Sequence, residues 1–352
     1  MSKLRVGIVG TGSISNEHIN AYLHHPDVEL CAFCDIDEIQ LNEMGDRYGI
    51  NSRYTDLDQM LHQQALDAVS ICTWNSTHAP CAIKALNAGV NVLCEKPMSI
   101  SAGDAQAMNM AAKQNNKLLM IGFVRRFGND CGILQDLINQ SFFGDLYYAK
   151  ATYLRRNGSP GGWFGDKSRS GGGPLIDLGV HVIDLIRYLM GNPKPVSVYG
   201  LTFHQLGDRK GVKSATGYQS AGAKETDIFD VEDLASALIR FDNGSALSVE
   251  ASFSLNLKED KGTIELFGTK GGAKLDPELE LYSDTGGYLS NTTLNIPTAL
   301  SFSGLFQNEI NHFVSCIKHH TPCLAPAQDG VEMMQILDAI YKSASTEHEV
   351  IL

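Results

Sequence analysis

Three polar side chains share one face of a helix that the sequence predicts to be buried. The helix starts near Pro174, because proline suits the first helical position, and it continues through apolar residues to Leu189. Asp177, His181 and Asp184 occupy positions i, i+4 and i+7, which lie on one stripe of an α-helix. A buried carboxylate costs free energy unless it has a partner. The pattern allows two interpretations: an Asp–His pair that satisfies itself at the helix start, or a general base, His181, held by a carboxylate at the edge of a cleft.

A glycine-rich turn follows the first predicted strand. Apolar residues 4–9 lead into Gly-Thr-Gly-Ser-Ile-Ser at 10–15, and a helical pattern follows. In this context Gly10 makes the tight turn and Gly12 lets the backbone approach a pyrophosphate at the helix N-terminus. Ser15 replaces the third glycine of the usual pattern, and the alternative is a glycine turn without a ligand. The residues that we expect to contact a dinucleotide here are Gly10, Gly12, Ser13 and Ile14.

An acidic residue ends the second predicted strand. Asp35, followed by Ile36, stands about 20 positions beyond the glycines, where a carboxylate binds the hydroxyls of the adenosine ribose. No lysine or arginine follows at once to accept a 2′-phosphate, which favours NAD over NADP. The alternative is that Asp35 caps the next helix, a role that Asp37 could fill equally well. We expect Asp35 and Ile36 to belong to the cofactor site.

The first third of the chain alternates apolar strands with helical patterns. This alternation over residues 4–122 predicts a parallel sheet buried on both faces, with ligands beyond the carboxyl ends of its strands. Two of the predicted strands, 65–72 and 91–94, end in polar loops. The alternative for the lysine in the second loop is a surface side chain at a strand end. The residues that we expect to complete the cofactor site are Thr73, Trp74, Asn75, His78, Glu95 and Lys96.

The pattern changes after Gly122, which predicts an α/β chain of two domains, residues 1–122 and 123–352. Asp242-Asn243-Gly244 joins two predicted strands, 231–241 and 246–253, as a hairpin. Further strands are predicted at 144–155, 196–203, 262–267 and 272–275, so the second domain is expected to be α+β with a mostly antiparallel open sheet. We predict that 157–173 is flexible, that 205–226 is a loop or lid, and that helices at 306–319 and 328–345 close the chain.

Composition excludes several classes of partner. The chain has 352 residues and a formal net charge of -12, so no nucleic-acid surface is expected. No apolar run is long enough to span a membrane and no signal peptide is expected, so we expect a cytoplasmic protein. Cys31 and Cys34 lie in a predicted strand, where residues three apart face opposite sides. We therefore expect no metal site there, and eight cysteines in a chain this long do not indicate a disulfide framework.

The glycine turn, Glu95-Lys96-Pro97 and the run DLGVHVID at 177–184 together resemble the Gfo/Idh/MocA oxidoreductase family. The resemblance covers nearly the whole chain. It implies a Rossmann domain, a C-terminal open-sheet domain that often mediates dimers or tetramers, and NAD(P)-dependent oxidation or reduction of sugars and polyols such as inositols. It also implies that Lys96, Asp177 and His181 match the catalytic residues of the family. The chain departs from the family at Trp74, where proline is common, so a tryptophan could cover the nicotinamide or fill space beneath it.

The resemblance gives each catalytic residue an expected role. We expect His181 to take the proton of the substrate hydroxyl, and Asp177 to orient the imidazole and stabilise its charged form. Lys96 is expected to donate to the reacting oxygen. Asp184 has two alternatives, a substrate hydroxyl acceptor or a partner of another side chain.

The identity of the substrate stays open at the sequence level. Arg126, Arg156, Asn157 and Trp163 are further candidates for substrate binding, although Arg156 could instead pair with a surface carboxylate. Two other functions remain on the same fold: a non-catalytic dinucleotide-sensing regulator, and an NAD-dependent lyase or glycosidase-like enzyme that oxidises its substrate transiently. A homodimer or homotetramer through the C-terminal sheet is expected from the resemblance.

Overall fold

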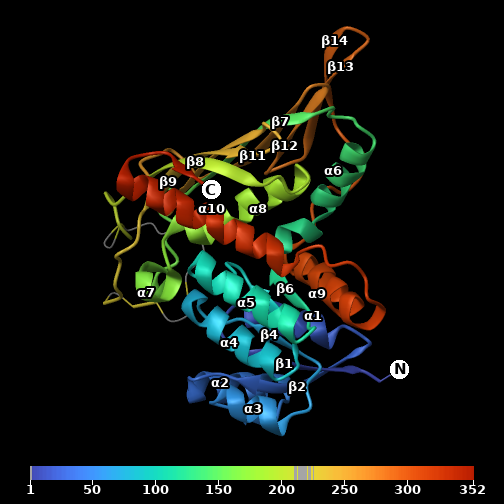
Figure 1. The fold of residues 1–352 in the computed structure, drawn as a ribbon, viewed down its shortest axis with the longest axis vertical. Helices are drawn as coiled ribbons and strands as arrows, with labels where there is room; N and C mark the ends of the chain where they lie inside the picture. The colour runs from blue at the N-terminus through green and yellow to red at the C-terminus, as the bar shows by residue number, and fades with distance from the viewer. Residues whose placement is uncertain (1, 210–211, 213–219, 221–222, 225) are drawn as a thin grey trace. The chain divides into compact units, whose positions relative to one another are not determined.

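The computed structural model describes residues 2–209, 212, 220, 223–224 and 226–352 (Figure 1). The described chain forms two compact units, the first made of residues 1–124 and 301–331, the second of residues 125–300 and 332–352. Most of the predicted loop or lid at 205–226 lies outside the described residues.

The first unit contains a six-stranded parallel sheet in the order β3-β2-β1-β4-β5-β6. This is the strand order of dinucleotide-binding folds, and it brings the ends of β1, β2, β4 and β5 to one edge. Its strands carry buried apolar residues such as Ile8, Val69 and Leu93, so both faces of the sheet must be shielded from water. The strands are β1 (Leu4–Val9), β2 (Val28–Cys34), β3 (Ser52–Tyr54), β4 (Ala68–Ile71), β5 (Asn91–Glu95) and β6 (Leu119–Gly122).

The helices of this unit follow the strands in turn. They are α1 (Ser15–Leu23), α2 (Glu38–Tyr48), α3 (Leu57–Gln63), α4 (Asn75–Asn87) and α5 (Ala102–Gln114). Helices α4 and α5 lie side by side (Figure 1). The sequence predicts all of these helices except the short α3. A glycine turn precedes α1, and the side chains of Asp37 and Ser101 cap α2 and α5, whereas α4 has no side-chain cap.

A segment near the C-terminus returns to the first unit. Helix α9 (Phe302–His319) packs against α1, and Gln307 Nε2 donates to the Ala21 carbonyl at 3.2 Å. After the helix, the Ile121 backbone N–H at β6 donates to the Ala325 carbonyl at 3.0 Å. The sequence places the domain boundary after residue 122 and assigns everything beyond it to the second domain. Residues 301–331 instead belong to the first unit. The contacts that hold them there come from residues far away in the sequence, which a local pattern does not reveal.

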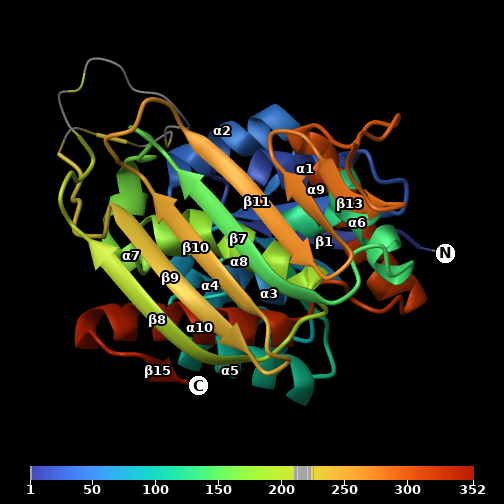
Figure 2. The same ribbon diagram turned by 90° about the horizontal axis from the view of Figure 1, so that it is seen from above.

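The second unit contains a nine-stranded sheet in the order β14-β13-β12-β11-β7-β10-β9-β8-β15 (Figure 2). All neighbouring strands are antiparallel except β7 and β10, so the prediction of a mostly antiparallel sheet is confirmed. The hairpin between β9 and β10 turns at Gly244, whose φ is +85°. The strands are β7 (Leu146–Leu154), β8 (Pro195–Phe203), β9 (Leu234–Phe241), β10 (Ala246–Ser252), β11 (Lys261–Gly268), β12 (Gly271–Leu275), β13 (Glu280–Thr285), β14 (Tyr288–Thr292) and β15 (Val350–Ile351).

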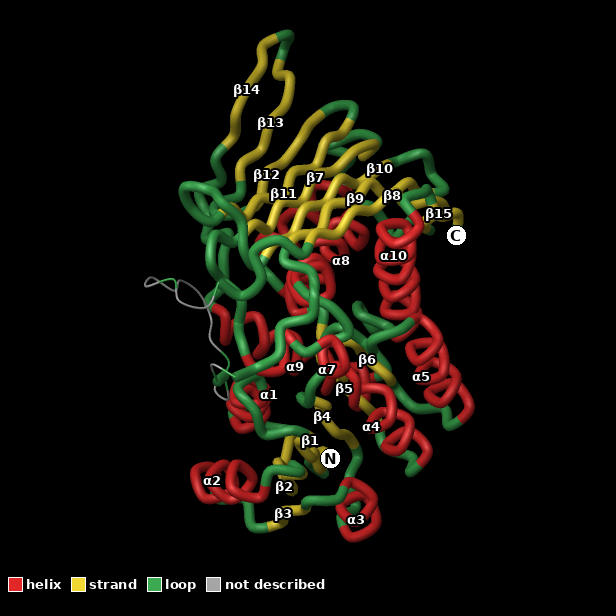
Figure 3. Tube along the Cα trace, turned by 90° about the vertical axis from the view of Figure 1, so that its left-hand side faces the viewer, coloured by secondary structure: helices red, strands yellow, loops and turns green. Residues whose placement is uncertain are grey.

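Helices cover one face of this sheet (Figure 3). Helix α8 (Val180–Leu189) contacts β7 and β11, and α10 (Ala327–Thr346) passes so close to Gly200 that a Cβ there would lie 2.8 Å from Ile340. Helix α6 (Asn129–Asn139) precedes β7. The predicted flexible segment at 157–173 instead holds a 3₁₀ turn (η2, Gly162–Gly165) and α7 (Lys167–Ser170), where the Asp166 carboxylate caps the helix.

The predicted helix from Pro174 is not one continuous α-helix. Its first turn is a π-turn (η3, Leu175–Gly179), in which the Val180 N–H reaches back to the Leu175 carbonyl, and α8 begins only after it. The predicted i, i+4, i+7 stripe assumed α-helical geometry throughout. Asp177 lies in the π-turn, so that spacing holds only for His181 and Asp184 within α8. π-turns of this kind are frequent at functional sites.

Candidate active site

The glycine turn of the first unit has the geometry that a bound dinucleotide needs. Gly10 has a φ of +87°, and a Cβ there would lie 2.8 Å from backbone atoms of Cys72 and Thr73. A Cβ on Gly12 would meet nothing within 4 Å, so the backbone is open to a ligand at the N-terminus of α1. Ser13 is exposed and Ile14 is half-buried. The turn therefore fits a pyrophosphate.

Asp35 is tied to the glycine turn rather than to the following helix. Its Oδ2 accepts from the Thr11 backbone N–H at 2.6 Å and from the Thr11 hydroxyl at 2.9 Å, and its Oδ1 accepts from the Asp37 N–H at 2.9 Å. Asp37 caps α2 by accepting from Ile39 and Gln40. Asp37, and not Asp35, therefore caps α2. The next residue, Ile36, is 74% exposed beside the carboxylate.

His78 joins the two polar loops that follow β4 and β5. Its Nδ1 lies 2.7 Å from the Pro97 carbonyl and its Nε2 lies 3.1 Å from the Thr73 carbonyl. Burial lowers the pKa of His78, which favours the neutral ring. A neutral imidazole has one N–H, so it donates to one of these carbonyls at a time. The buried ring fixes the loop that carries Lys96, although the sequence suggested only a cofactor contact.

Trp74 and Asn75 stand at the start of α4, with Trp74 as its N-cap residue. Asn75 is buried, whereas Trp74 and Lys96 are half-buried. Lys96 follows the last residue of β5, and its backbone N–H donates to Glu95 Oε2 at 3.2 Å. These positions agree with the expected edge of the parallel sheet.

Beneath the loop that carries Lys96 lies a buried acidic cluster that the sequence analysis missed. His18 Nε2 lies 2.8 Å from Glu95 Oε1, and His18 Nδ1 lies 3.2 Å from the Ser70 hydroxyl. Glu309 of α9 is fully buried against this pair, and within the described chain neither of its carboxyl oxygens has a hydrogen-bond partner. Burial raises the pKa of Glu309 well above its usual range, and the nearby Glu95 carboxylate adds a smaller increase. Burial therefore favours the protonated form of Glu309.

Replacing Glu309 by glutamine is expected to flatten the pH dependence of stability. A carboxyl group that stays protonated in the folded state but ionises above about pH 4.3 when unfolded makes the free energy of unfolding fall as pH rises. The slope reaches at most about 1.4 kcal/mol per pH unit and ends at the folded-state pKa. Urea unfolding from pH 4 to 9 measures the change. Exposed Glu43 offers the control Glu43→Gln, and parallel curves for Glu309→Gln and the unsubstituted chain would contradict the assignment.

In the second unit, the carboxylate of Glu232 holds the start of the helix that carries Asp177 and His181. Glu232 accepts from the Gly173 N–H at 3.0 Å, from the Leu175 N–H at 3.2 Å and from the Tyr341 hydroxyl at 2.9 Å. A Cβ on Gly173 would lie 2.2 Å from the Glu232 carbonyl oxygen, so the approach requires glycine. Burial raises the pKa of Glu232. A faint signal of this anchor is visible in the sequence, where Glu232 stands at the start of an apolar predicted strand.

Asp184 pairs with Arg126. Arg126 Nε donates to Asp184 Oδ2 at 2.9 Å and its Nη2 donates to Oδ1 at 2.6 Å, with 0% and 2% of the two side chains exposed. The Arg126 guanidinium also lies over the Tyr188 ring, 4.6 Å from its centroid. Of the two alternatives for Asp184, this geometry favours a partner of another side chain. Burial of both groups also argues against direct substrate contact by Arg126.

The remaining substrate candidates lie near the start of the segment 157–173. Arg156 is exposed and its guanidinium donates to the Lys258 carbonyl at 3.1 Å, and among the described residues no carboxylate forms an ion pair with it. Asn157 forms an isolated bridge with Ser254. Trp163 stacks on Phe164 with their ring centroids 4.0 Å apart. Asp177 and His181 are half-buried, which leaves part of each side chain accessible.

Comparison with known proteins identifies the family. Residues 4–123 match an oxidoreductase family with an NAD-binding Rossmann fold, and residues 133–274 match the GFO/IDH/MocA C-terminal domain. The chain is 32% identical to a D-glucoside 3-dehydrogenase of Escherichia coli over 98% of this chain and 96% of that protein. The chain belongs to the Gfo/Idh/MocA oxidoreductase family.

Two other Gfo/Idh/MocA relatives widen the comparison. A myo-inositol 2-dehydrogenase of Thermotoga maritima is 26% identical over 99% of this chain and 98% of that protein. A levoglucosan dehydrogenase, solved with NADH and L-sorbose, has a TM-score of 0.85 and 25% identity, covering 100% of this chain and 99% of that chain.

The comparisons confirm three expectations from the sequence. The chain is a member of the Gfo/Idh/MocA family, it combines a Rossmann domain with a mostly antiparallel C-terminal domain, and it is an NAD-binding oxidoreductase. Within the described residues, no helix is both long and apolar enough to cross a membrane.

Proposed function

We propose that this oxidoreductase transfers a hydride between NAD and a secondary alcohol of a pyranose sugar or a related polyol. The proposal rests on the similarity to a D-glucoside 3-dehydrogenase, which extends over nearly the full length of both proteins. The names of the levoglucosan and myo-inositol dehydrogenases point to the same class of cyclic polyhydroxy compound.

The residues at the strand ends of the first unit suit NAD. Gly12 and the N-terminus of α1 offer an open backbone to the pyrophosphate, and exposed Ile36 offers an apolar surface beside the adenosine. The Asp35 carboxylate accepts three hydrogen bonds, which leaves about one of its four acceptor sites for a ribose hydroxyl. Its negative charge disfavours a 2′-phosphate. When bound, NAD supplies the hydride acceptor.

The catalytic proposal assigns one task to each of three side chains. His181 takes the proton that leaves the substrate hydroxyl, which requires a ring with a pKa near the ambient pH. Asp177 orients the imidazole and stabilises its protonated form. Lys96 donates to the same oxygen as negative charge develops on it. The Glu232 anchor at the helix start, and His78 beside Pro97, support the segments that carry these residues.

A substrate panel tests the function. Methyl glucosides, free pyranoses, inositols and sugar acids are each mixed with NAD or NADP, and NADH formation is followed by absorbance. We expect turnover with at least one pyranoside and a kcat/KM with NAD at least ~10-fold above that with NADP. Binding of NAD without turnover of any compound would indicate the regulator, and net substrate conversion without NADH release would indicate the lyase; either result contradicts the proposal.

We also propose that the protein is a homo-oligomer through the sheet of the second unit. Alternate residues of β8, Tyr199, Leu201 and Phe203, are exposed, and exposed Leu238 pairs with Tyr199 in the neighbouring strand. An apolar face of this kind favours association. Light scattering is expected to give a dimer or tetramer mass, and Leu201→Glu is expected to lower it, whereas Ile39→Glu on α2 is not. A monomer at micromolar concentration would overturn the proposal.

A further inference from the structure

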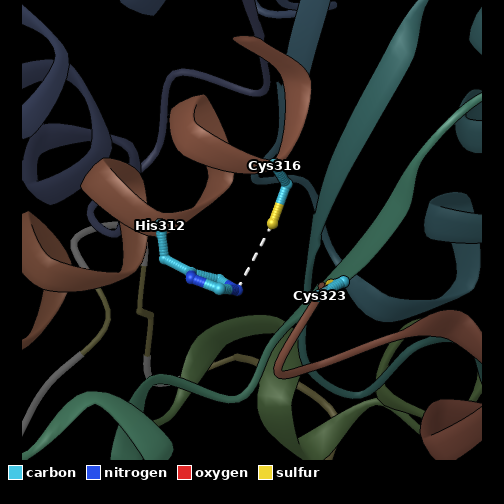
Figure 4. Close-up of side chains that lie close together, drawn as sticks. All are labelled: His312, Cys316 and Cys323. Carbon is cyan, nitrogen blue, oxygen red and sulfur yellow. Dashed lines mark hydrogen bonds between the residues drawn. The ribbon is translucent and has the colours of Figure 1, made fainter. Parts of the chain in front are cut away.

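A histidine and two cysteines converge at the end of α9, outside the candidate active site. His312 and Cys316 lie one turn apart on the helix, and Cys323 follows in the loop (Figure 4). His312 Nε2 lies 3.3 Å from Cys316 Sγ, and the ligand atoms of all three residues lie within 4.8 Å of one another. The three residues belong to the first unit.

The size of this cluster matches the coordination sphere of a thiophilic ion. Zinc binds cysteine sulfur at about 2.3 Å and histidine nitrogen at about 2.0–2.1 Å in tetrahedral sites, which places neighbouring ligand atoms roughly 3.5–3.8 Å apart. The His312 Nε2–Cys316 Sγ separation of 3.3 Å is close to those values, and no other separation between the three ligand atoms exceeds 4.8 Å. Sulfur and imidazole ligands favour zinc over magnesium or calcium.

The backbone around the cluster also suits a site of this kind. The helix ends at His320, which adopts a left-handed conformation with a φ of +56° and turns the chain so that Cys323 faces back to Cys316. The Ala325 backbone N–H donates to the Cys323 sulfur, and the two cysteines share a hydrogen bond. An ion would replace the thiol protons that the cluster now shares.

We propose that His312, Cys316 and Cys323 bind one zinc-like divalent cation, with water as the fourth ligand. Both cysteines bind as thiolates, and their two protons pass to solvent. The Leu324 N–H, 3.0 Å from His312 Nε2, must give up this contact when Nε2 binds the ion. That loss, together with only three protein ligands, makes the site weaker than a four-cysteine site.

The location of the site gives the ion a structural task. The loop continues to Ala325, which accepts from Ile121, and to Pro326, which forms a bridge with Met120 of β6. The ion therefore ties α9 to the segment that extends the edge of the parallel sheet. From the sequence we expected no metal, on the geometry of Cys31 and Cys34 alone. The His-x₃-Cys-x₆-Cys spacing becomes a ligand set only after the turn at His320.

Metal titration of the untagged full chain tests the proposal. Chelator-treated, reduced protein is expected to take up one equivalent of zinc, and cobalt is expected to give a thiolate-to-metal charge-transfer band. Cys323→Ser and His312→Ala are each expected to weaken zinc binding by at least ~10²-fold, since each removes one of three protein ligands. Cys31→Ser, at a partly exposed thiol on β2, is the matched control and is expected to bind zinc normally.

Thermal unfolding supplies a second readout that does not depend on activity. Zinc is expected to raise the unfolding midpoint of the unsubstituted chain and of Cys31→Ser, but not that of Cys323→Ser. Three results overturn the proposal: no zinc uptake by the reduced protein, uptake that Cys323→Ser leaves unchanged, or a Cys316–Cys323 disulfide that persists in the reductant used for the titration.

Discussion

Replacing Lys96 or His181 by alanine is expected to lower kcat by about 10²–10⁴-fold while NAD still binds. Removing His181 leaves the hydroxyl proton without a positioned base. Removing Lys96 leaves the developing negative charge on the oxygen without its cationic donor. Both effects arise in the transition state, so kcat and kcat/KM for the sugar fall together.

The controls separate chemistry from folding. His62 and Lys113 are exposed in the first unit, and His62→Ala and Lys113→Ala are expected to keep normal rates. NAD affinity, measured by quenching of tryptophan fluorescence, is expected to change less than ~10-fold in the His181 variant, because that residue is assigned to the proton and not to the cofactor. Near-normal turnover in either active-site variant would remove that residue from the mechanism.

Features encoded by neighbouring residues were accessible from the sequence. The glycine turn, Asp35 and the loop that carries Lys96 each follow a short apolar strand, and parallel strands bring their carboxyl ends to one edge whatever the tertiary detail. The hairpin at Gly244 needed only its turn residues and two alternating strands. Local patterns therefore predicted most of the order of elements and the edge of the sheet at which the proposed cofactor residues lie.

Features that depend on distant partners were missed. Glu232 reaches Gly173 across 59 positions, and the sequence shows only an acidic residue in an apolar strand. Glu309 belongs with His18 and Glu95, yet α9 returns to the first unit only through tertiary contacts. The strands β13 and β14 were missed because their exposed, polar residues lack the alternation of a half-buried strand. The π-turn at 175–179 cannot be distinguished from an α-helix by hydrophobic pattern alone.

The Arg126–Asp184 pair shows how a distant partner changes the assignment of a residue. From sequence, Asp184 is an acid on the same helix as His181, and a substrate contact is as reasonable as a structural one. Its partner stands 58 positions earlier and closes a bidentate pair in the core of the second unit. Breaking such a buried pair leaves an uncompensated charge, which costs far more than an exposed pair contributes.

Asp184→Asn is therefore expected to destabilise the second unit by about 3–5 kcal/mol, because the Arg126 guanidinium stays buried without its carboxylate. Urea unfolding followed by fluorescence measures the change. The chain has two tryptophans, so in a Trp74→Phe background Trp163 reports on the second unit alone. Asp58→Asn, which breaks the exposed Lys84–Asp58 pair, is the matched control and is expected to cost at most about 1 kcal/mol.

The double variant Arg126→Met/Asp184→Leu distinguishes charge burial from packing. Removing both charges together is expected to restore most of the stability lost in Asp184→Asn, because apolar side chains of similar volume avoid the cost of burying an ion. A direct substrate role for Asp184 predicts the opposite pattern, in which Asp184→Asn keeps the urea midpoint and lowers kcat/KM for the sugar. That outcome would return Asp184 to the substrate site and make the pair with Arg126 secondary.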